Sequence, residues 1–302
     1  MEQVYRKQVE LLIRCLPEVE KQTCFALKGG TAINLFVRDM PRLSVDIDLV
    51  YLPIESREET LTNIENGLNE IAENIEATIT KSIRRTAGKE KHVNKLLISH
   101  DGAQIKIEPN IVQRGTVYDV ESRDLCARAE TEFEISATAS TLATAELYGS
   151  KINAALDRQH PRDLFDIMLL LQNEGLTGEV RKAFVVYLAC HPRPMHELLK
   201  PNRLDIEDTF KTQFDGMTNV PINLQALIET RETLIRRINE ELTDKERQFL
   251  LSINQMAPDW TLLNINGLED LPAIQWKLHN IEKMSKNKHH ESTENLKKAL
   301  KL

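Results

Sequence analysis

The chain has 302 residues, a net charge of −7 and 41% hydrophobic residues, enough for one large domain or two ordinary ones with a real core. No stretch approaches the roughly 18 uninterrupted apolar residues of a membrane span, and the charged first ten residues do not resemble a signal sequence, so we expect a soluble cytoplasmic protein with no membrane partner. The acidic balance argues against nucleic-acid binding over the whole surface, and no stable DNA binding is expected.

The first fifty residues predict a helix, a strand, a second helix and a second strand. Apolar residues recur at helical spacing through residue 16. Cys24 to Leu27 predict a short strand that runs into Gly29 and Gly30. A brief helix follows and must end before Pro41, because the residue ahead of a proline avoids the α region. Alternation over residues 45–50 then predicts a strand with two aspartates on one face.

The next hundred residues predict a long helix, a hairpin and two more helices. Residues 55–78 carry the clearest amphipathic pattern. Two apolar strands flank Asp101-Gly102, a dipeptide suited to hairpin turns, and the second strand places Gln104, Lys106 and Glu108 on one face. Helices are predicted over Ala139 to Leu156 and Pro161 to Leu171, with a stop at Gly175.

Beyond about residue 176 the patterns are helical only. We therefore expect an α+β protein, with a mixed β-sheet flanked by helices in residues 1–135 and a mostly helical domain in residues 136–302. The tail from about residue 285 is rich in lysine and histidine, and we expect it to be flexible. The four cysteines lack metal-ligand spacing, so reduced thiols are expected rather than a zinc site.

Asp46 and Asp48 repel each other on one strand face unless a cation or hydrogen-bond donors compensate. Paired carboxylates invite Mg²⁺, which prefers carboxylate and phosphate oxygens. Gly29 and Gly30 stand before a helix, where backbone N–H groups can cradle phosphate. Each feature also has a structural explanation, an exposed edge strand for the aspartates and a tight turn for the glycines. Together they describe a site for a nucleoside triphosphate (NTP).

The stretch "KGGTAINLFVRDMPRLSVDIDL" resembles the first motif of the AbiEii/AbiGii toxin family, a branch of the DNA polymerase β-like nucleotidyltransferase superfamily. In that motif GG[TS]A is followed by an apolar helix and R-x-S-x-D-x-D. A second stretch, "ELYGSKINAALDRQHPRDLFDIMLLL", resembles the family's later motif, a lysine-bearing helix followed by an R-D-hydrophobic-hydrophobic-D helix. The matching residues are Gly29, Gly30, Thr31, Ala32, Arg42, Ser44, Asp46 and Asp48, then Lys151, Arg158, Arg162, Asp163 and Asp166.

The resemblance implies an N-terminal nucleotidyltransferase fold and transfer of a nucleotide from an NTP, with one or two Mg²⁺ ions. It also implies a cognate antitoxin, encoded as an operon partner, and a tRNA acceptor, because some family members extend tRNA and so block translation. The implied roles are phosphate or nucleotide binding (Gly29, Gly30, Thr31, Ser44, Lys151, Asp166), metal binding (Asp46, Asp48, Glu108) and catalysis (the same three carboxylates with Lys151 and Asp163). Glu108 stands where the superfamily usually has an aspartate, which leaves the number of metal ions open.

Residues 81–95 hold six Lys or Arg against one Glu, which is typical of a solvated face and also suits RNA. We name Arg84, Arg85 and Arg158 as candidate RNA contacts. Three alternatives stay open: a protein or small-molecule acceptor, a nucleotide-binding protein without turnover, and a helical C-terminal part that binds the antitoxin.

Overall fold

A computed structural model describes residues 3–302. The chain forms two compact units, and it crosses between them more than once. The first unit contains residues up to Leu147 together with Asp215–Pro221, and the second contains Tyr148–Phe214 and Ile222–Leu302. No helix of residues 3–302 is both long enough and apolar enough to cross a membrane.

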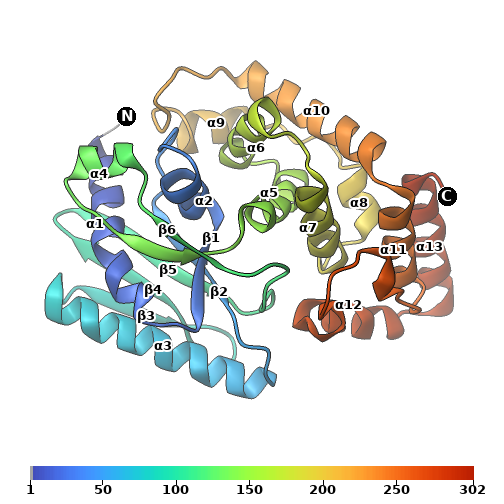
Figure 1. Ribbon diagram of the computed structural model, residues 1–302, viewed down its shortest axis with the longest axis horizontal. Helices are drawn as coiled ribbons and strands as arrows, with labels where there is room; N and C mark the ends of the chain where they lie inside the picture. Colours follow the sequence, from blue (N-terminus) through green and yellow to red (C-terminus); the bar gives the residue numbers. More distant parts are fainter. Residues whose placement is uncertain (1–2) are drawn as a thin grey trace. The chain divides into compact units, whose positions relative to one another are not determined.

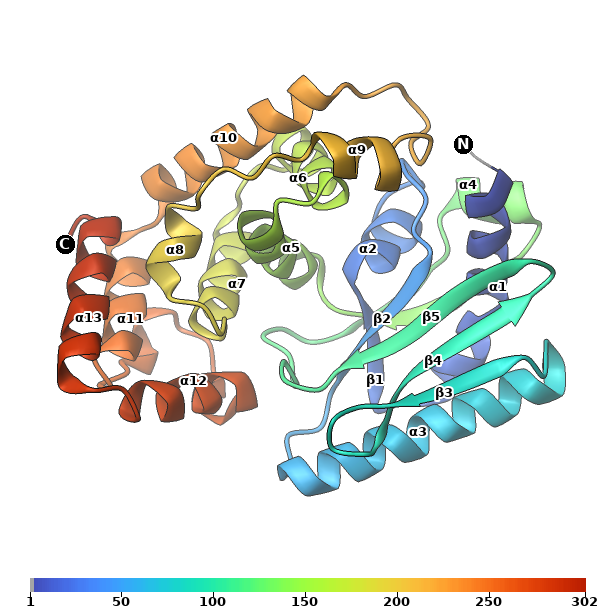
Figure 2. The same ribbon diagram turned by 180° about the vertical axis from the view of Figure 1, so that it is seen from behind.

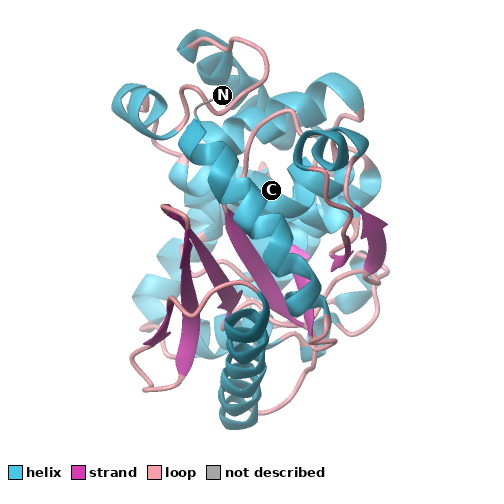
Figure 3. Ribbon diagram, turned by 90° about the vertical axis from the view of Figure 1, so that its left-hand side faces the viewer, coloured by secondary structure: helices cyan, strands magenta, loops and turns pink. Residues whose placement is uncertain are grey.

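A seven-stranded mixed sheet forms the centre of the first unit (Figure 1). The strand order is β3-β4-β5-β2-β1-β7-β6; β2 pairs with β5 in parallel, β1 with β7 in parallel, and the other pairs are antiparallel. This confirms the mixed sheet. The strands, magenta in Figure 3, are β1 (Phe25–Lys28), β2 (Asp46–Tyr51), β3 (Ile83–Ala87), β4 (Val93–His100), β5 (Ala103–Asn110), β6 (Glu121–Asp124) and β7 (Thr138–Thr141).

Two long helices cover one face of this sheet. Helix α1 (Gln3–Glu20) contacts β5 and β7, and α3 (Arg57–Thr78) contacts β4; Figure 2 shows α3 beside β3 and β4. Helix α3 begins at a capping box in which Ser56 and Glu59 each accept from the other's backbone N–H. The remaining helices of the unit are α2 (Gly29–Ala32), a π-helical turn (Ile33–Val37) and α4 (Ala127–Phe133).

The alternation of β2 decides which side chains point away from α3. Ile47 and Leu49 are buried, and Tyr51, on their face, donates to Glu55 at the start of α3 and stacks edge-on with Phe25. Successive side chains of a strand point to opposite faces. Asp46 and Asp48 therefore share the other face, as the sequence predicts.

The second unit is helical. Its helices are α5 (Thr144–Arg158, beginning in the first unit), α6 (Pro161–Asn173), α7 (Gly178–Ala189), α8 (Met195–Leu199), α9 (Glu207–Gln213), α10 (Leu224–Glu241), α11 (Asp244–Asn254), α12 (Pro272–Glu282) and α13 (Lys286–Leu300), with 3-10 turns at Trp260–Leu262 and Leu268–Asp270. Pro161 stands in the first turn of α6, and Gly175, with φ +72°, follows its end, both as predicted.

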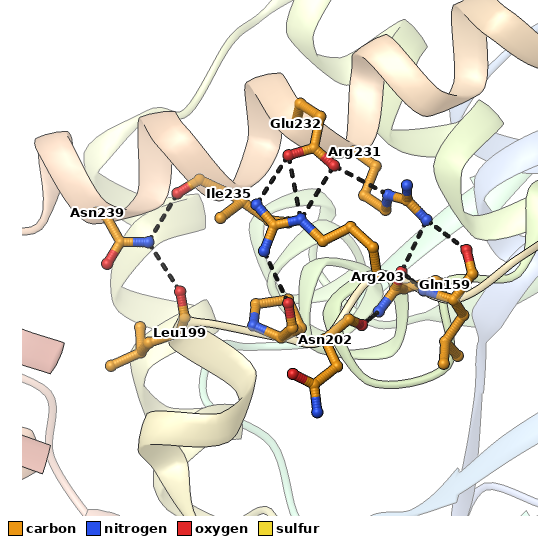
Figure 4. Close-up of polar contacts among 10 residues, drawn as sticks. Gln159, Leu199, Asn202, Arg203, Arg231, Glu232, Ile235 and Asn239 are labelled. Atoms are coloured by element: carbon orange, nitrogen blue, oxygen red, sulfur yellow. Dashed lines mark hydrogen bonds and ion pairs between the residues drawn. The ribbon is translucent and has the colours of Figure 1, made fainter. Parts of the chain in front are cut away.

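A polar network fastens α10 to the segment between α8 and α9 (Figure 4). Arg231, nearly buried, donates to Gln159 Oε1 at 3.0 Å and to the Leu204 carbonyl at 2.8 Å. Arg203 pairs with Glu232 at 2.8 Å. Because buried polar groups are costly without partners, these contacts fix an otherwise irregular segment against α10.

Three expectations need correction. The helix predicted from Ala139 begins at Thr144, because residues 138–141 instead pair with β1 and β6 as β7. The division between units falls after Leu147, inside α5, rather than after residue 135. The tail expected to be flexible forms α13, where Leu296 and Leu300 are buried and the helix contacts α8 and α11.

Candidate active site

The glycine pair packs directly against the acidic strand. Gly29 has φ +73°, and a Cβ at this position would lie 2.6 Å from Asp48 Oδ2. A Cβ at Gly30 would lie 2.7 Å from Arg42 Nη2 and 2.9 Å from Ser44 Oγ. At contacts under 3.0 Å something must shift, so a side chain at either glycine would displace Asp48, or Arg42 and Ser44, and the positive φ of Gly29 also favours glycine. The pairing of Lys28 with Asp48 across β1 and β2 produces it.

Buried hydroxyl and guanidinium groups hold α2 against the start of β2. Thr31 Oγ1 donates to the Asp46 carbonyl at 2.5 Å, and Ser44 Oγ lies 3.0 Å from the same Thr31 oxygen. Arg42, 2% exposed, donates to the Leu43 carbonyl at 2.9 Å. These contacts give Thr31 and Ser44 a structural part in shaping the site beside the nucleotide-binding part predicted for them.

Three carboxylates lie on one face of two neighbouring strands. In the parallel register of β2 and β5, Asp48 stands opposite Glu108 and Asp46 opposite Lys106. Glu108 is bound on both oxygens, with Lys95 Nζ 2.9 Å from Oε1 and Lys106 Nζ 2.8 Å from Oε2. The structure thus brings the three predicted acidic residues to one place and adds two lysines.

The charges in this cluster alter one another's protonation. Burial raises the pKa of Glu108, but hydrogen bonds from Lys106 and Lys95 outweigh it, and the net pKa is lowered. Burial lowers the pKa of Lys106, but its bond to Glu108 and the charges of Asp46 and Asp48 outweigh it, and the net pKa is raised. Glu108 is therefore an anion and Lys106 a cation at neutral pH.

The donor set suits a hard divalent cation at the two aspartates. Asp46 and Asp48 offer carboxylate oxygens two residues apart on one strand face, and Mg²⁺ is commonly held by one or two carboxylates plus substrate phosphates. Gly29 leaves space beside the Asp48 carboxylate that a Cβ would fill. In residues 3–302 no group of three His, Cys, Asp or Glu side chains is arranged for a metal.

The second predicted motif forms a buried ion cluster between α5 and α6. Lys151 Nζ lies 2.9 Å from Asp163 Oδ1 and 3.1 Å from Asp166 Oδ2. Arg158, seven residues after Lys151, binds Asp163 from its Nε at 2.6 Å. Burial raises the pKa of Asp163, but Lys151 and Arg158 outweigh it and hold that pKa far below its usual range. The contacts needed for Asp163 and Asp166 to position Lys151 are therefore present.

The candidate RNA contacts differ in their surroundings. Arg84 is exposed on β3, the edge strand of the sheet. Arg85 on the same strand pairs with Glu76 at 2.8 Å. Arg158 is 62% exposed although it binds Asp163.

A comparison with protein-family models shows to which family the chain belongs. The model described as nucleotidyl transferase AbiEii toxin, type IV toxin–antitoxin system, matches residues 10–280. The chain belongs to the AbiEii family. It is a nucleotidyltransferase, and a toxin of a type IV system, which implies a cognate antitoxin and an NTP substrate. The reading as a nucleotide-binding protein without turnover is not supported.

The fold agrees with that of a solved nucleotidyltransferase toxin. MenT4, the nucleotidyltransferase toxin Rv2826c of Mycobacterium tuberculosis H37Rv, superposes with a TM-score of 0.61 and 16% identity, over 90% of this chain and 92% of its own. At this identity the likeness shows the shared fold. No curated protein sequence matches the chain.

Sequence reasoning placed Lys106 on the face of Glu108 but gave it no part in the site, and it missed Lys95. The alternation of β5 placed Lys106 on the face of Glu108, so that signal was available. Lys95 lies on β4, and its approach depends on the antiparallel register in which Leu96 faces Ile107. No local pattern in the sequence specifies that register.

Proposed function

We propose that this AbiEii toxin transfers a nucleotide from an NTP to tRNA, with Mg²⁺ as cofactor, and so inhibits growth. The observation that carries the proposal is the packing of Gly29 against Asp48 and of Gly30 against Arg42 and Ser44. It unites a phosphate-binding backbone and a metal-binding pair within one compact unit. The first N–H groups of a helix lack intrahelical acceptors and can receive phosphate oxygens.

In this proposal the residues mainly position and neutralise. Gly29, Gly30 and Thr31 would bind phosphate oxygens through backbone N–H groups, and Asp46 and Asp48 would hold Mg²⁺. When bound, the ion neutralises phosphate charge and lowers the barrier to displacement of pyrophosphate. The protein needs little covalent chemistry, because orientation and electrostatic stabilisation supply most of the rate.

From the second motif, Lys151 is proposed to interact with the triphosphate, and Asp163 and Asp166 to hold its ammonium in place. Two variants of Lys151 separate a role in nucleotide transfer from a purely structural role. Lys151→Met should remove transfer whereas Lys151→Arg should retain some of it. If both variants fold and transfer at the wild-type rate, Lys151 is structural only.

The choice of tRNA is supported by the family resemblance and by exposed basic residues on β3 and in the segments before and after it, namely Lys81, Arg84, Lys89 and Lys91. Charge reversal at Arg84 and Arg85 should weaken tRNA binding and reduce its dependence on salt, because fewer phosphate counterions are released. If the dependence of binding on salt stayed unchanged, these basic residues would be a solvated surface that does not bind tRNA.

The decisive experiment incubates the protein with each of the four radiolabelled NTPs, total RNA and cell protein, and separates the products on a gel. We expect label in the tRNA band. Asp48→Asn should reduce labelling at least about a hundredfold, whereas Asp101→Asn, an exposed hairpin aspartate, should not. Label in protein or in a small molecule would replace tRNA as the acceptor.

A further inference from the structure

The carboxylate of Glu108 is occupied in a way that bears on the number of metal ions. Each of its oxygens contacts a different ammonium group, Lys95 Nζ at 2.9 Å and Lys106 Nζ at 2.8 Å. A second ion would need this third carboxylate, since paired ions are bridged by shared acidic ligands. An ion that approached Glu108 would meet two positive charges.

The strand registers make this arrangement a property of the sheet rather than of one flexible side chain. Lys106 precedes Glu108 by two residues on β5 and so shares its face. Leu97 of β4 stands opposite Lys106, and Lys95, two residues earlier, reaches the same face. The pairing of the strands therefore places both lysines beside Glu108.

The charge count of the cluster supports the same conclusion. Glu108 brings one negative charge, and Lys95 and Lys106, which bind it, bring two positive charges, so these three side chains together carry a net positive charge. The side chains of Glu108, Lys95 and Lys106 are 33%, 31% and 29% exposed. They remain within reach of a ligand, which would meet both ammonium groups.

We propose that Glu108 is the counter-ion of Lys95 and Lys106, not a metal ligand, and that the chain binds one divalent ion through Asp46 and Asp48. The two ammonium groups then supply the positive charge that a second ion would bring to the triphosphate. The inference rests on the proposed function, because it takes Asp46 and Asp48 as the metal ligands.

The test counts bound Mn²⁺ by the loss of its free-ion electron paramagnetic resonance signal, without nucleotide. The wild-type protein should bind one ion. Asp48→Asn should weaken that binding at least about tenfold, whereas Glu108→Gln should change it less than about threefold. The double variant Lys95→Met/Lys106→Met frees Glu108 and should bind a second ion, or the first at least about tenfold more tightly. The matched variant Lys95→Arg/Lys106→Arg keeps both charges and should behave as wild type.

Two bound ions in the wild type, or a loss with Glu108→Gln equal to that with Asp48→Asn, would overturn the inference. Circular dichroism melting identifies variants that fail to fold; if Glu108→Gln is among them, the wild-type count and the lysine double variant decide. If Asp48→Asn and Asp46→Asn leave Mn²⁺ binding and nucleotide transfer intact, the proposed function fails instead. The two failures therefore have different signatures.

Discussion

Both units of this toxin pair carboxylates with lysines, but at very different burial. Glu108 and its two lysines in the first unit are each about one third exposed. Asp163, Asp166 and Lys151 in the second unit are at most 6% exposed. Breaking a buried ion pair costs several kcal/mol of stability, whereas a partly exposed ion pair contributes about 1 kcal/mol or less. Glu108 and its two lysines can therefore exchange their ion pairs for contacts with a ligand, whereas Lys151, Asp163 and Asp166 keep one arrangement.

The largest expected effect tests the buried cluster. Asp163→Ala should lower the free energy of unfolding by about 3 kcal/mol, because Lys151 and Arg158 lose a shared carboxylate. Urea denaturation measures it. Glu108→Gln, in the partly exposed cluster, should lower the free energy of unfolding by less than about 1 kcal/mol. Equal losses in the two variants would remove the contrast between the units.

A second buried lysine, Lys277, shows how burial shifts the pKa where backbone carbonyls bind the ammonium group. Lys277 Nζ donates to the carbonyls of His191 at 2.7 Å and Arg193 at 2.8 Å. Burial lowers the pKa of Lys277 from 10.5 to about 8, and the charges of Cys190 and Glu197 oppose this only in part.

Because the unfolded chain holds the Lys277 proton up to a higher pH than the folded protein does, stability should rise as pH increases from about 8 to 10.5. At about 1.4 kcal/mol for each pH unit, this contribution is at most about 3.5 kcal/mol. Denaturation at pH 8, 9 and 10.5 measures the rise. Lys277→Met should lack it, and an identical rise in that variant would assign the effect to other groups.

Two glycines with the same backbone conformation test the close contact between Gly29 and Asp48. Gly29 and Gly102 have φ +73° and +78°, but a Cβ at Gly102 meets nothing within 4 Å. Alanine at either position should cost about 1 kcal/mol of stability through the left-handed backbone, and at Gly29 the close contact with Asp48 should add to this cost. Only Gly29→Ala should also reduce nucleotide transfer, by at least about tenfold, since it displaces Asp48. Similar activities in the two variants would contradict this.

The smallest effect is expected at an exposed pair. Arg85→Ala removes the contact with Glu76, whose two side chains are each 32% exposed. It should cost less than about 1 kcal/mol, and less still in 1 M salt, where surface charges are screened. Thermal melts at low and high salt, with Arg84→Ala as the neighbouring control, measure it. A salt-independent loss above about 2 kcal/mol would show that exposure is a poor guide to these pairs.

Where the local pattern was strong, the sequence predicted the fold correctly. The apolar periodicity of α3, the Asp101-Gly102 hairpin and Pro161 at the start of α6 all lie where expected. The pattern failed at β7, whose small and polar residues form a strand only because β1 and β6 pair with it. It also failed at α13, where lysines and histidines obscured the apolar stripe of Leu296 and Leu300.

The sequence by itself determined the family and the residue types of the site, because two glycines before a helix and two aspartates on a strand are local chemical patterns. Only the tertiary structure decided that Gly29 touches Asp48 and that Glu108 faces two lysines. These facts depend on how β1, β2, β4 and β5 are aligned with one another. Such alignment is set by packing over the whole sheet, where a slip of one residue would turn every side chain to the other face.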